Sequence, residues 1–314
     1  MFGRCPASWL RILNPQMLRL YVTTLAALAG LAFGSFLNVC LSRWPAGESV
    51  VTPRSHCRAC GRTLTWWENV PLVSWLALRG RCRTCKATIS WRYPLVELAV
   101  GGVWSWIAWQ RLGLFLSRLA VGITLRPSAA YADVEIAVGM GVFCLLMIGL
   151  AVLDAQLLWL PDIVTLPGAG LGILYSISLI MGSTGYITVQ PPILQQIVEY
   201  LFGILVSALL ILLIRWTYWL IRRREGLGLG DAKLMALLAA WLGLPGALLS
   251  FVIGVVLGAV VGVIAIARAP RGTGAPSPGL LKLPLGTFLC IGGIVSALWG
   301  PQILEAYLRY AGFN

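Results

Sequence analysis

Two aspartates beside long apolar stretches are the residues with the clearest capacity for chemistry. Asp154 closes the apolar run that ends in Ala151-Val-Leu-Asp154, and Asp231 follows alternating glycines in Gly226-Leu-Gly-Leu-Gly-Asp231-Ala-Lys233. A carboxylate beside a membrane-length segment is costly to desolvate, so it usually faces protein or water and serves a function. The structural alternative for Asp231 is to cap a helix N-terminus, and Asp162 is expected to cap the helix that it begins.

A pair of facing carboxylates supports the hydrolysis of a peptide bond. If Asp154 and Asp231 meet in a partly desolvated cleft, like-charge repulsion keeps a proton on one of them while the other acts as a general base on water. A Ser/His/Asp arrangement is excluded, because the one histidine of the chain, His56, lies beside a cysteine motif. The residue inventory therefore predicts an aspartic-protease mechanism with Asp154 and Asp231 as the catalytic residues.

Four cysteines form a second candidate site. They occur as two C-x-x-C motifs, Cys57/Cys60 and Cys82/Cys85, with 21 residues between them. This spacing supplies four thiolates for a tetrahedral structural zinc ion. Disulfides and a rubredoxin-like iron site are the alternatives, and a reducing cytoplasmic location argues against the disulfides.

The apolar segments that carry these residues indicate a polytopic membrane protein. The chain has 314 residues, of which 59% are hydrophobic and 11% charged. We expect an all-α fold with about eight transmembrane helices, because apolar runs of roughly 20 residues span a bilayer. They lie at about 20–42, 94–113, 133–153, 163–182, 196–219, 232–249, 250–267 and 283–303.

The polar segment 43–93 divides the chain into three expected domains. Residues 1–42 form an N-terminal segment with the first span, and 43–93 form a small zinc-ribbon-like domain. Residues 94–314 form a multi-span protease domain. The polar segment is too short to hold a large core, so metal binding would supply much of its folding free energy.

The positive charge follows the membrane topology. The net charge is +13, and 17 of the 24 Lys and Arg residues fall in loops on one side if the N-terminus is outside. This asymmetry places those loops in the cytoplasm. Asp154, Asp231 and the cysteine domain then lie on the cytoplasmic side. We expect membrane lipid, and not nucleic acid, to be the partner of the basic residues.

Together, these motifs resemble the bacterial type IV prepilin peptidases, also called prepilin leader peptidase/N-methyltransferases, which are GxGD-type membrane aspartyl proteases. The resemblance runs from Gly34 to about Gly292. Besides both cysteine motifs, it includes Gly34-Ser-Phe-Leu-Asn-Val, Ser90-Trp-Arg-Tyr-Pro-Leu-Val-Glu97, Asp154-x6-Pro-Asp162 and Gly228-Leu-Gly-Asp231-Ala-Lys-Leu.

The resemblance implies a bifunctional enzyme of the bacterial cytoplasmic (inner) membrane. Asp154 and Asp231 would cleave the short leader from prepilin and pseudopilin precursors. S-adenosylmethionine would then serve as the donor that methylates the new N-terminal amine.

Residues that contact the substrate or the methyl donor are harder to place, because the sequence has no glycine-rich nucleotide loop after a strand. The candidates are Arg43, Asn69, Arg92, Glu97 and Lys233. A structural ion pair between Arg92 and Glu97 is an alternative. Two other functions stay open at this point: a membrane scaffold or transporter with a zinc-ribbon domain, and a GxGD protease that acts on other substrates without methylation.

Overall fold

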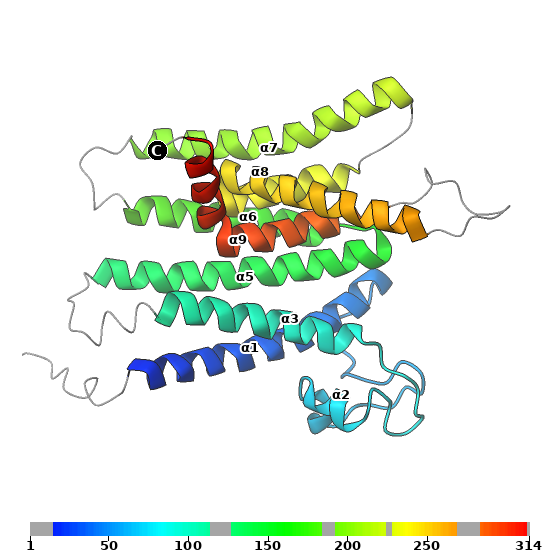
Figure 1. Ribbon diagram of the computed structural model, residues 1–314. Helices are drawn as coiled ribbons and strands as arrows, with labels where there is room; N and C mark the ends of the chain where they lie inside the picture. The colour runs from blue at the N-terminus through cyan, green and yellow to red at the C-terminus, as the bar shows by residue number, and fades with distance from the viewer. Residues whose placement is uncertain (1–14, 114–126, 184–191, 224–227, 269–282, 313–314) are drawn as a thin grey trace, which may run out of the picture. The chain divides into compact units, whose positions relative to one another are not determined.

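A computed structural model describes residues 15–113, 127–183, 192–223, 228–268 and 283–312 (Figure 1). All the regular secondary structure in these ranges is helical, which confirms the expected all-α class. Six of these helices are long and apolar enough to cross a membrane. The chain divides into two compact units, residues 1–145 and 146–314, which we describe separately.

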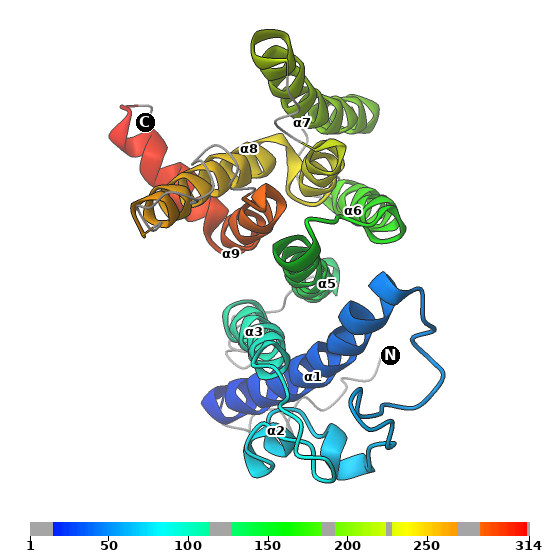
Figure 2. The same ribbon diagram turned by 90° about the vertical axis from the view of Figure 1, so that its right-hand side faces the viewer.

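In the first unit, which also holds the first part of α5 (Pro127–Leu157), helices α1 (Pro15–Arg43) and α3 (Arg92–Ile107) pack along each other (Figure 2). A π-helical turn, η3 (Ala108–Leu112), continues α3. Small residues allow the close approach. A Cβ atom on Gly34 would lie only 2.8 Å from the Cα atom of Glu97, so a larger residue would push the helices apart.

The cysteine domain connects these two helices. Its helical turns are short: η1 (Trp44–Ala46), η2 (Trp66–Asn69) and α2 (Val73–Ala77). The two C-x-x-C motifs fold alike. The N–H groups of Cys57 and Cys82 each donate to a carbonyl five residues later, and isolated β-bridges flank both motifs, His56–Thr63 and Arg81–Thr88. The sequence spacing therefore produces two equivalent knuckles, as the zinc-ribbon-like prediction requires.

The second unit is a helical bundle. It contains the end of α5 (Pro127–Leu157), then α6 (Asp162–Ser183), α7 (Ile193–Arg222), α8 (Leu229–Arg268) and α9 (Leu285–Tyr310). α8 packs against α6, α7 and α9. Its first half is almost completely buried, from Leu234 to Ala240. Apolar segments of this length fold as helices in a bilayer, because a helix makes every backbone hydrogen bond within its own segment.

Each of the eight expected spans falls on a helix, but one expected boundary was wrong. The spans 232–249 and 250–267 both lie in α8, and the helix breaks at Gly243 (φ 68°, ψ 177°) rather than near residue 249. A glycine adopts this positive φ without strain, and Pro245 cannot donate a backbone hydrogen bond. The count of six spans takes α8 as one helix and leaves out α3, which has 16 residues.

Candidate active site and metal centre

Asp154 lies in the last turn of α5, where its side chain is held by the start of α9. Its Oδ2 atom accepts hydrogen bonds from the backbone N–H of Thr287 at 2.6 Å and from the Thr287 hydroxyl at 3.1 Å. The first backbone N–H groups of a helix have no hydrogen-bond acceptor within that helix. Asp154 provides the acceptor for one such N–H group of α9. Gly286 permits the contact, because a Cβ there would lie 2.9 Å from Cγ of Asp154.

Asp231 lies in the first turn of α8 and is also buried. Its Oδ2 atom accepts a hydrogen bond from the backbone N–H of Gly228 at 3.1 Å. The carboxylate thus reaches back to the residue before the helix, as an acidic residue does in the third position of a capping box. The structural alternative considered for Asp231 is therefore realised, and it uses one of the two carboxylate oxygens.

Leu160 lies against both Gly230, which precedes Asp231, and Gly286, which contacts Asp154. Cβ atoms built on Gly230 and on Gly286 would lie 3.3 Å and 3.1 Å from its side chain. The Asp154 and Asp231 carboxylates are close enough for their charges to interact. Among the described residues, Oδ1 of each aspartate accepts no hydrogen bond, whereas Oδ2 of each is held by a backbone N–H. One oxygen of each carboxylate is thus left for other ligands.

Asp162 and Lys233 pair with each other on the surface. Nζ of Lys233 lies 2.6 Å from Oδ1 of Asp162, and both side chains are partly exposed. Asp162 is the first residue of α6, as expected, and this ion pair occupies one of its oxygens.

The four cysteines of the two knuckles meet as the spacing predicts. The sulfur atoms of Cys57, Cys60, Cys82 and Cys85 all lie within 4.8 Å of one another. Four thiolates at such distances can surround one zinc ion tetrahedrally. Backbone N–H groups of Cys85 and Thr84 lower the pKa of the Cys82 thiol to about 6. The four-thiol donor set therefore fits a thiolate-bound metal.

An ion pair supports the first knuckle. Arg62 donates to Glu68 at 2.5 Å, and Glu68 also accepts from the N–H and the hydroxyl of Thr65. The hydrogen bond from Arg62 is the main reason that the pKa of Glu68 falls to about 2. Since η2 begins after Thr65, Glu68 fixes that turn beside the metal site.

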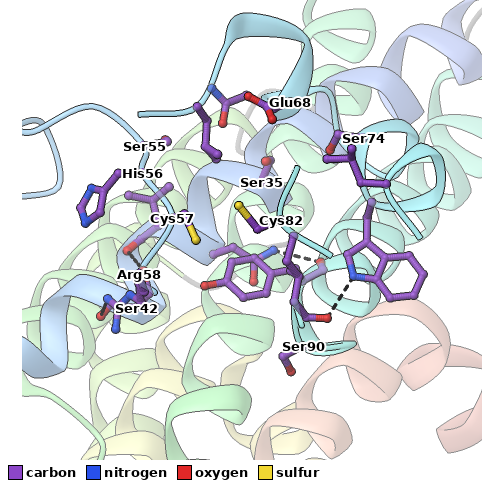
Figure 3. A pocket seen from close by; sticks show the side chains of 18 of the residues that line it. Ser35, Ser42, Ser55, His56, Cys57, Arg58, Glu68, Ser74, Cys82 and Ser90 are labelled. Atoms are coloured by element: carbon purple, nitrogen blue, oxygen red, sulfur yellow. Dashed lines mark hydrogen bonds between the residues drawn. The ribbon is translucent and has the colours of Figure 1, made fainter. Parts of the chain in front are cut away.

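A cavity of about 420 Å³ lies within the first unit, between the cysteine domain and the adjoining ends of α1 and α3 (Figure 3). Cys57 and Cys82 lie at its wall. Its uncharged polar side chains include Ser35, Asn38, Asn69, Ser74 and Ser90.

Two acceptors at this cavity stand out. Asn38 is 1% exposed and donates to the Tyr93 carbonyl at 2.9 Å, but its Oδ1 atom accepts no hydrogen bond among the described residues. The Glu97 carboxylate accepts from the Leu72 N–H at 2.8 Å and from the Ser35 hydroxyl. A buried polar atom without a partner requires an explanation, and a bound donor would supply one.

The five predicted contact residues do not form one group. Arg43, Asn69 and Glu97 line the cavity, whereas Arg92, the first residue of α3, is not among the lining residues. Arg43 is buried, and its guanidinium donates to the carbonyls of Ser49 and Pro53, so it holds the following loop. Lys233 belongs to the second unit.

Sequence reasoning missed Thr287 and Ser35. Both are small hydroxyl residues within apolar helices, and nothing in their spacing singles them out. The irregular sequence Leu283-Pro-Leu-Gly286 directly before Thr287 was the one available signal.

Comparison with known proteins identifies the family of the chain. Residues 28–111 match the family model described as the bacterial peptidase A24 N-terminal domain, and residues 141–263 match that of the type IV leader peptidase family. A Stutzerimonas stutzeri protein named prepilin leader peptidase/N-methyltransferase is 34% identical, over 91% of this chain and 93% of its own length. A Pseudomonas aeruginosa protein of the same name is 32% identical over the same shares.

A Myxococcus xanthus protein, also named prepilin leader peptidase/N-methyltransferase, is 36% identical over 77% of this chain and 62% of its own length. No solved structure matches the chain. The two family models span residues 28–111, where the four cysteines of the knuckles lie, and 141–263, where both aspartates lie. The resemblance inferred from the motifs is therefore confirmed, and the chain belongs to the type IV leader peptidase family.

Proposed function

We propose that this protein removes the short leader of type IV prepilins and pseudopilins, with Asp154 and Asp231 as its catalytic pair. The main observation in support is that two buried carboxylates, at the end of α5 and the start of α8, interact electrostatically and each keep one unbonded oxygen. Such a pair shares one proton, as in aspartic proteases. The family relationship supports the substrate class.

The reaction needs no covalent intermediate. The ionised aspartate takes a proton from a water molecule, whose oxygen bonds to the scissile carbonyl carbon, while the protonated aspartate gives its proton to the carbonyl oxygen. When the tetrahedral gem-diol collapses, the C–N bond breaks, the leaving amine takes up the proton from the first aspartate, and one gem-diol hydroxyl returns its proton to the second aspartate. The dyad thereby returns to a singly protonated state.

We also propose that the cavity of the first unit holds S-adenosylmethionine, which supplies the methyl group for the new N-terminal amine. This donor is a cation with an ammonium group, and the residues present fit it. Oδ1 of Asn38 is a buried acceptor without a partner, and Glu97 adds a carboxylate at the same wall. Asn38 and Glu97 would bind the ammonium group, and Asn69 would lie at the wall beside them.

We propose the metal site and the membrane orientation on the same basis. Cys57, Cys60, Cys82 and Cys85 would hold a structural Zn²⁺ that keeps the knuckles, and so the cavity wall, in place. The positive charge of the loops supports an orientation with the aspartates and the zinc domain on the cytoplasmic side of the bacterial inner membrane. That orientation would bring them to the side on which prepilins are made.

The test is cleavage of a purified prepilin by the full-length enzyme in lipid vesicles, followed by product mass. We expect Asp154→Asn and Asp231→Asn each to lose at least about a thousandfold in kcat/KM. An asparagine side chain can neither share nor transfer the proton that the two aspartates exchange with water and substrate. Asp162→Asn is the matched control, since Asp162 is exposed and pairs with Lys233. Cleavage that survives in either dyad variant would contradict the proposal. Cleavage of other membrane peptides but not prepilin would instead favour a GxGD protease of different specificity.

A further inference from the structure

The starting point is an asymmetry between the two aspartates. Both carboxylates lie at a helix N-terminus, Asp231 at its own helix α8 and Asp154 at the start of α9. The dipoles of α8 and α9 therefore favour an anion at each position, whereas the C-terminal end of α5, which carries Asp154, opposes one there. Each also accepts one backbone N–H at Oδ2. Within the described residues, only Asp154 accepts a further hydrogen bond, from the Thr287 hydroxyl.

The Thr287 hydroxyl has two acceptors and a single proton. Its Oγ1 atom lies 3.1 Å from Oδ2 of Asp154 and also 3.1 Å from the carbonyl oxygen of Ala151. When Asp154 is ionised, the hydroxyl can donate to it. When Asp154 is protonated, the hydroxyl can turn to the Ala151 carbonyl and accept from the carboxyl group. The same side chain can thus satisfy Asp154 in both protonation states.

We propose that Thr287 is a positioning residue that makes Asp154 the general base of the dyad and leaves the shared proton on Asp231. Donors to a carboxylate stabilise its charged form, and the described residues supply two of them to Asp154 against one to Asp231. Because both donors bind Oδ2, Oδ1 of Asp154 is the oxygen that would deprotonate the water. The inference rests on the proposed function of the dyad and assigns its two roles.

Other titratable groups near Asp154 do not create this asymmetry. Asp231 on α8 and the buried Cys290 thiol on α9 both interact with it electrostatically. Cys290 interacts with both aspartates, so its effect is common to the pair. Lys233 on α8 is paired with Asp162 of α6.

The test is the pH profile of kcat/KM for prepilin cleavage, without a methyl donor, for wild type, Thr287→Val and Thr287→Ser. Valine keeps the shape and the backbone N–H but removes the hydroxyl. We expect its acidic limb to move to higher pH by about one unit, and the rate on that limb to fall about tenfold, as loss of one hydrogen bond to a charge predicts. Serine restores the hydroxyl and should stay within about threefold of wild type at every pH, since the donor is the same.

Thr165→Val is the matched control, because this buried threonine of the same unit donates to the Pro161 carbonyl. A Thr287→Val profile that superimposes on the wild-type profile would overturn the inference, as would a Thr287→Ser shift as large as that of valine. If Asp154→Asn and Asp231→Asn are inactive in that case, the dyad stands and only the role of Thr287 fails. If either of them stays active, the proposed function itself has failed.

Discussion

Lys233 and Asp162 form an ion pair, although each stands close in the sequence to one of the two aspartates proposed as catalytic. Their 2.6 Å contact joins α8 to the start of α6, and both side chains are partly exposed. The pair offers a structural role for Lys233, as an alternative to the predicted contact with a substrate or methyl donor.

We therefore expect Lys233→Met to change prepilin cleavage by less than about threefold and stability by about 0.5 kcal/mol, as is usual for an exposed ion pair. Thermal unfolding in detergent and kcat/KM for the prepilin are the measurements, with Asp162→Asn as the partner variant. A loss of cleavage in Lys233→Met that Asp162→Asn does not share would show that Lys233 contacts the substrate after all.

Removal of the metal should unfold the cysteine domain but leave the helices in place. The four sulfur atoms lie within 4.8 Å of one another, and the segment around them has little other regular structure. The wild-type protein should carry about one zinc per chain, and Cys57→Ser or a strong chelator should abolish it, because thiolates supply the whole ligand set.

Metal analysis and limited proteolysis between residues 43 and 93 check this prediction. Cys144→Ala is the control, because Cys144 is buried in α5 and outside the cluster. Full zinc content and protease resistance in Cys57→Ser would contradict it.

Glu68 should make the stability of the first knuckle depend on pH in acid. Its folded pKa is about 2, mainly because Arg62 donates to it, whereas an unfolded glutamate titrates near ~4.3. A lowered pKa contributes stability that is fully present above the unfolded value and is lost as the pH falls toward the folded one. The advantage of wild type over Glu68→Gln should thus shrink between about pH 4.3 and pH 2.

Hydrogen exchange of peptides that cover residues 62–70 measures this difference in both proteins. Comparing two proteins at each pH removes the effect of acid on the thiolates, which they share. A difference that stays constant down to about pH 2 would exclude the Arg62–Glu68 pair as its cause.

The stability of the first unit should depend on the close packing of α1 against α3. In Gly34→Ala, the new Cβ would lie 2.8 Å from the Cα of Glu97, so the helices must separate. We expect a loss of about 1–3 kcal/mol, as for other overpacked sites. Gly102→Ala on α3 is the control, since a Cβ there meets no atom within 4 Å and should be neutral or slightly stabilising. Equal unfolding temperatures for the two variants would contradict the packing.

Methyl transfer should depend on Glu97 without involving it in cleavage. In Glu97→Gln the amide oxygen can still accept from the Leu72 N–H, but the negative charge at the cavity is lost. We expect the KM for S-adenosylmethionine to rise at least about tenfold, the cost of a lost charge-assisted hydrogen bond, with leader cleavage unchanged. Product mass at a series of donor concentrations measures both activities. An unchanged KM would argue that the donor binds elsewhere.

Much of this protein can be predicted from the sequence alone, because the physical signals are local. Long runs without charge must form helices in a bilayer, and the structure confirms that class. The spacing of the four cysteines predicts one cluster, and their sulfur atoms do meet. Asp154 and Asp231 stood out because a carboxylate at the end of an apolar span is rare. Their catalytic roles stay predictions.

Tertiary structure decided what those residues contact. Thr287 is 133 residues from Asp154 in the chain, and Leu72 is 25 residues from Glu97, so no periodicity or spacing could have paired them. Arg43 turned inward to hold a loop, and the oxygen of Asn38 was left without a partner at a cavity wall. Such contacts depend on which helices pack together and at what depth, and these are global properties of the chain. The sequence determined which groups the protein has, and packing determined which of them meet.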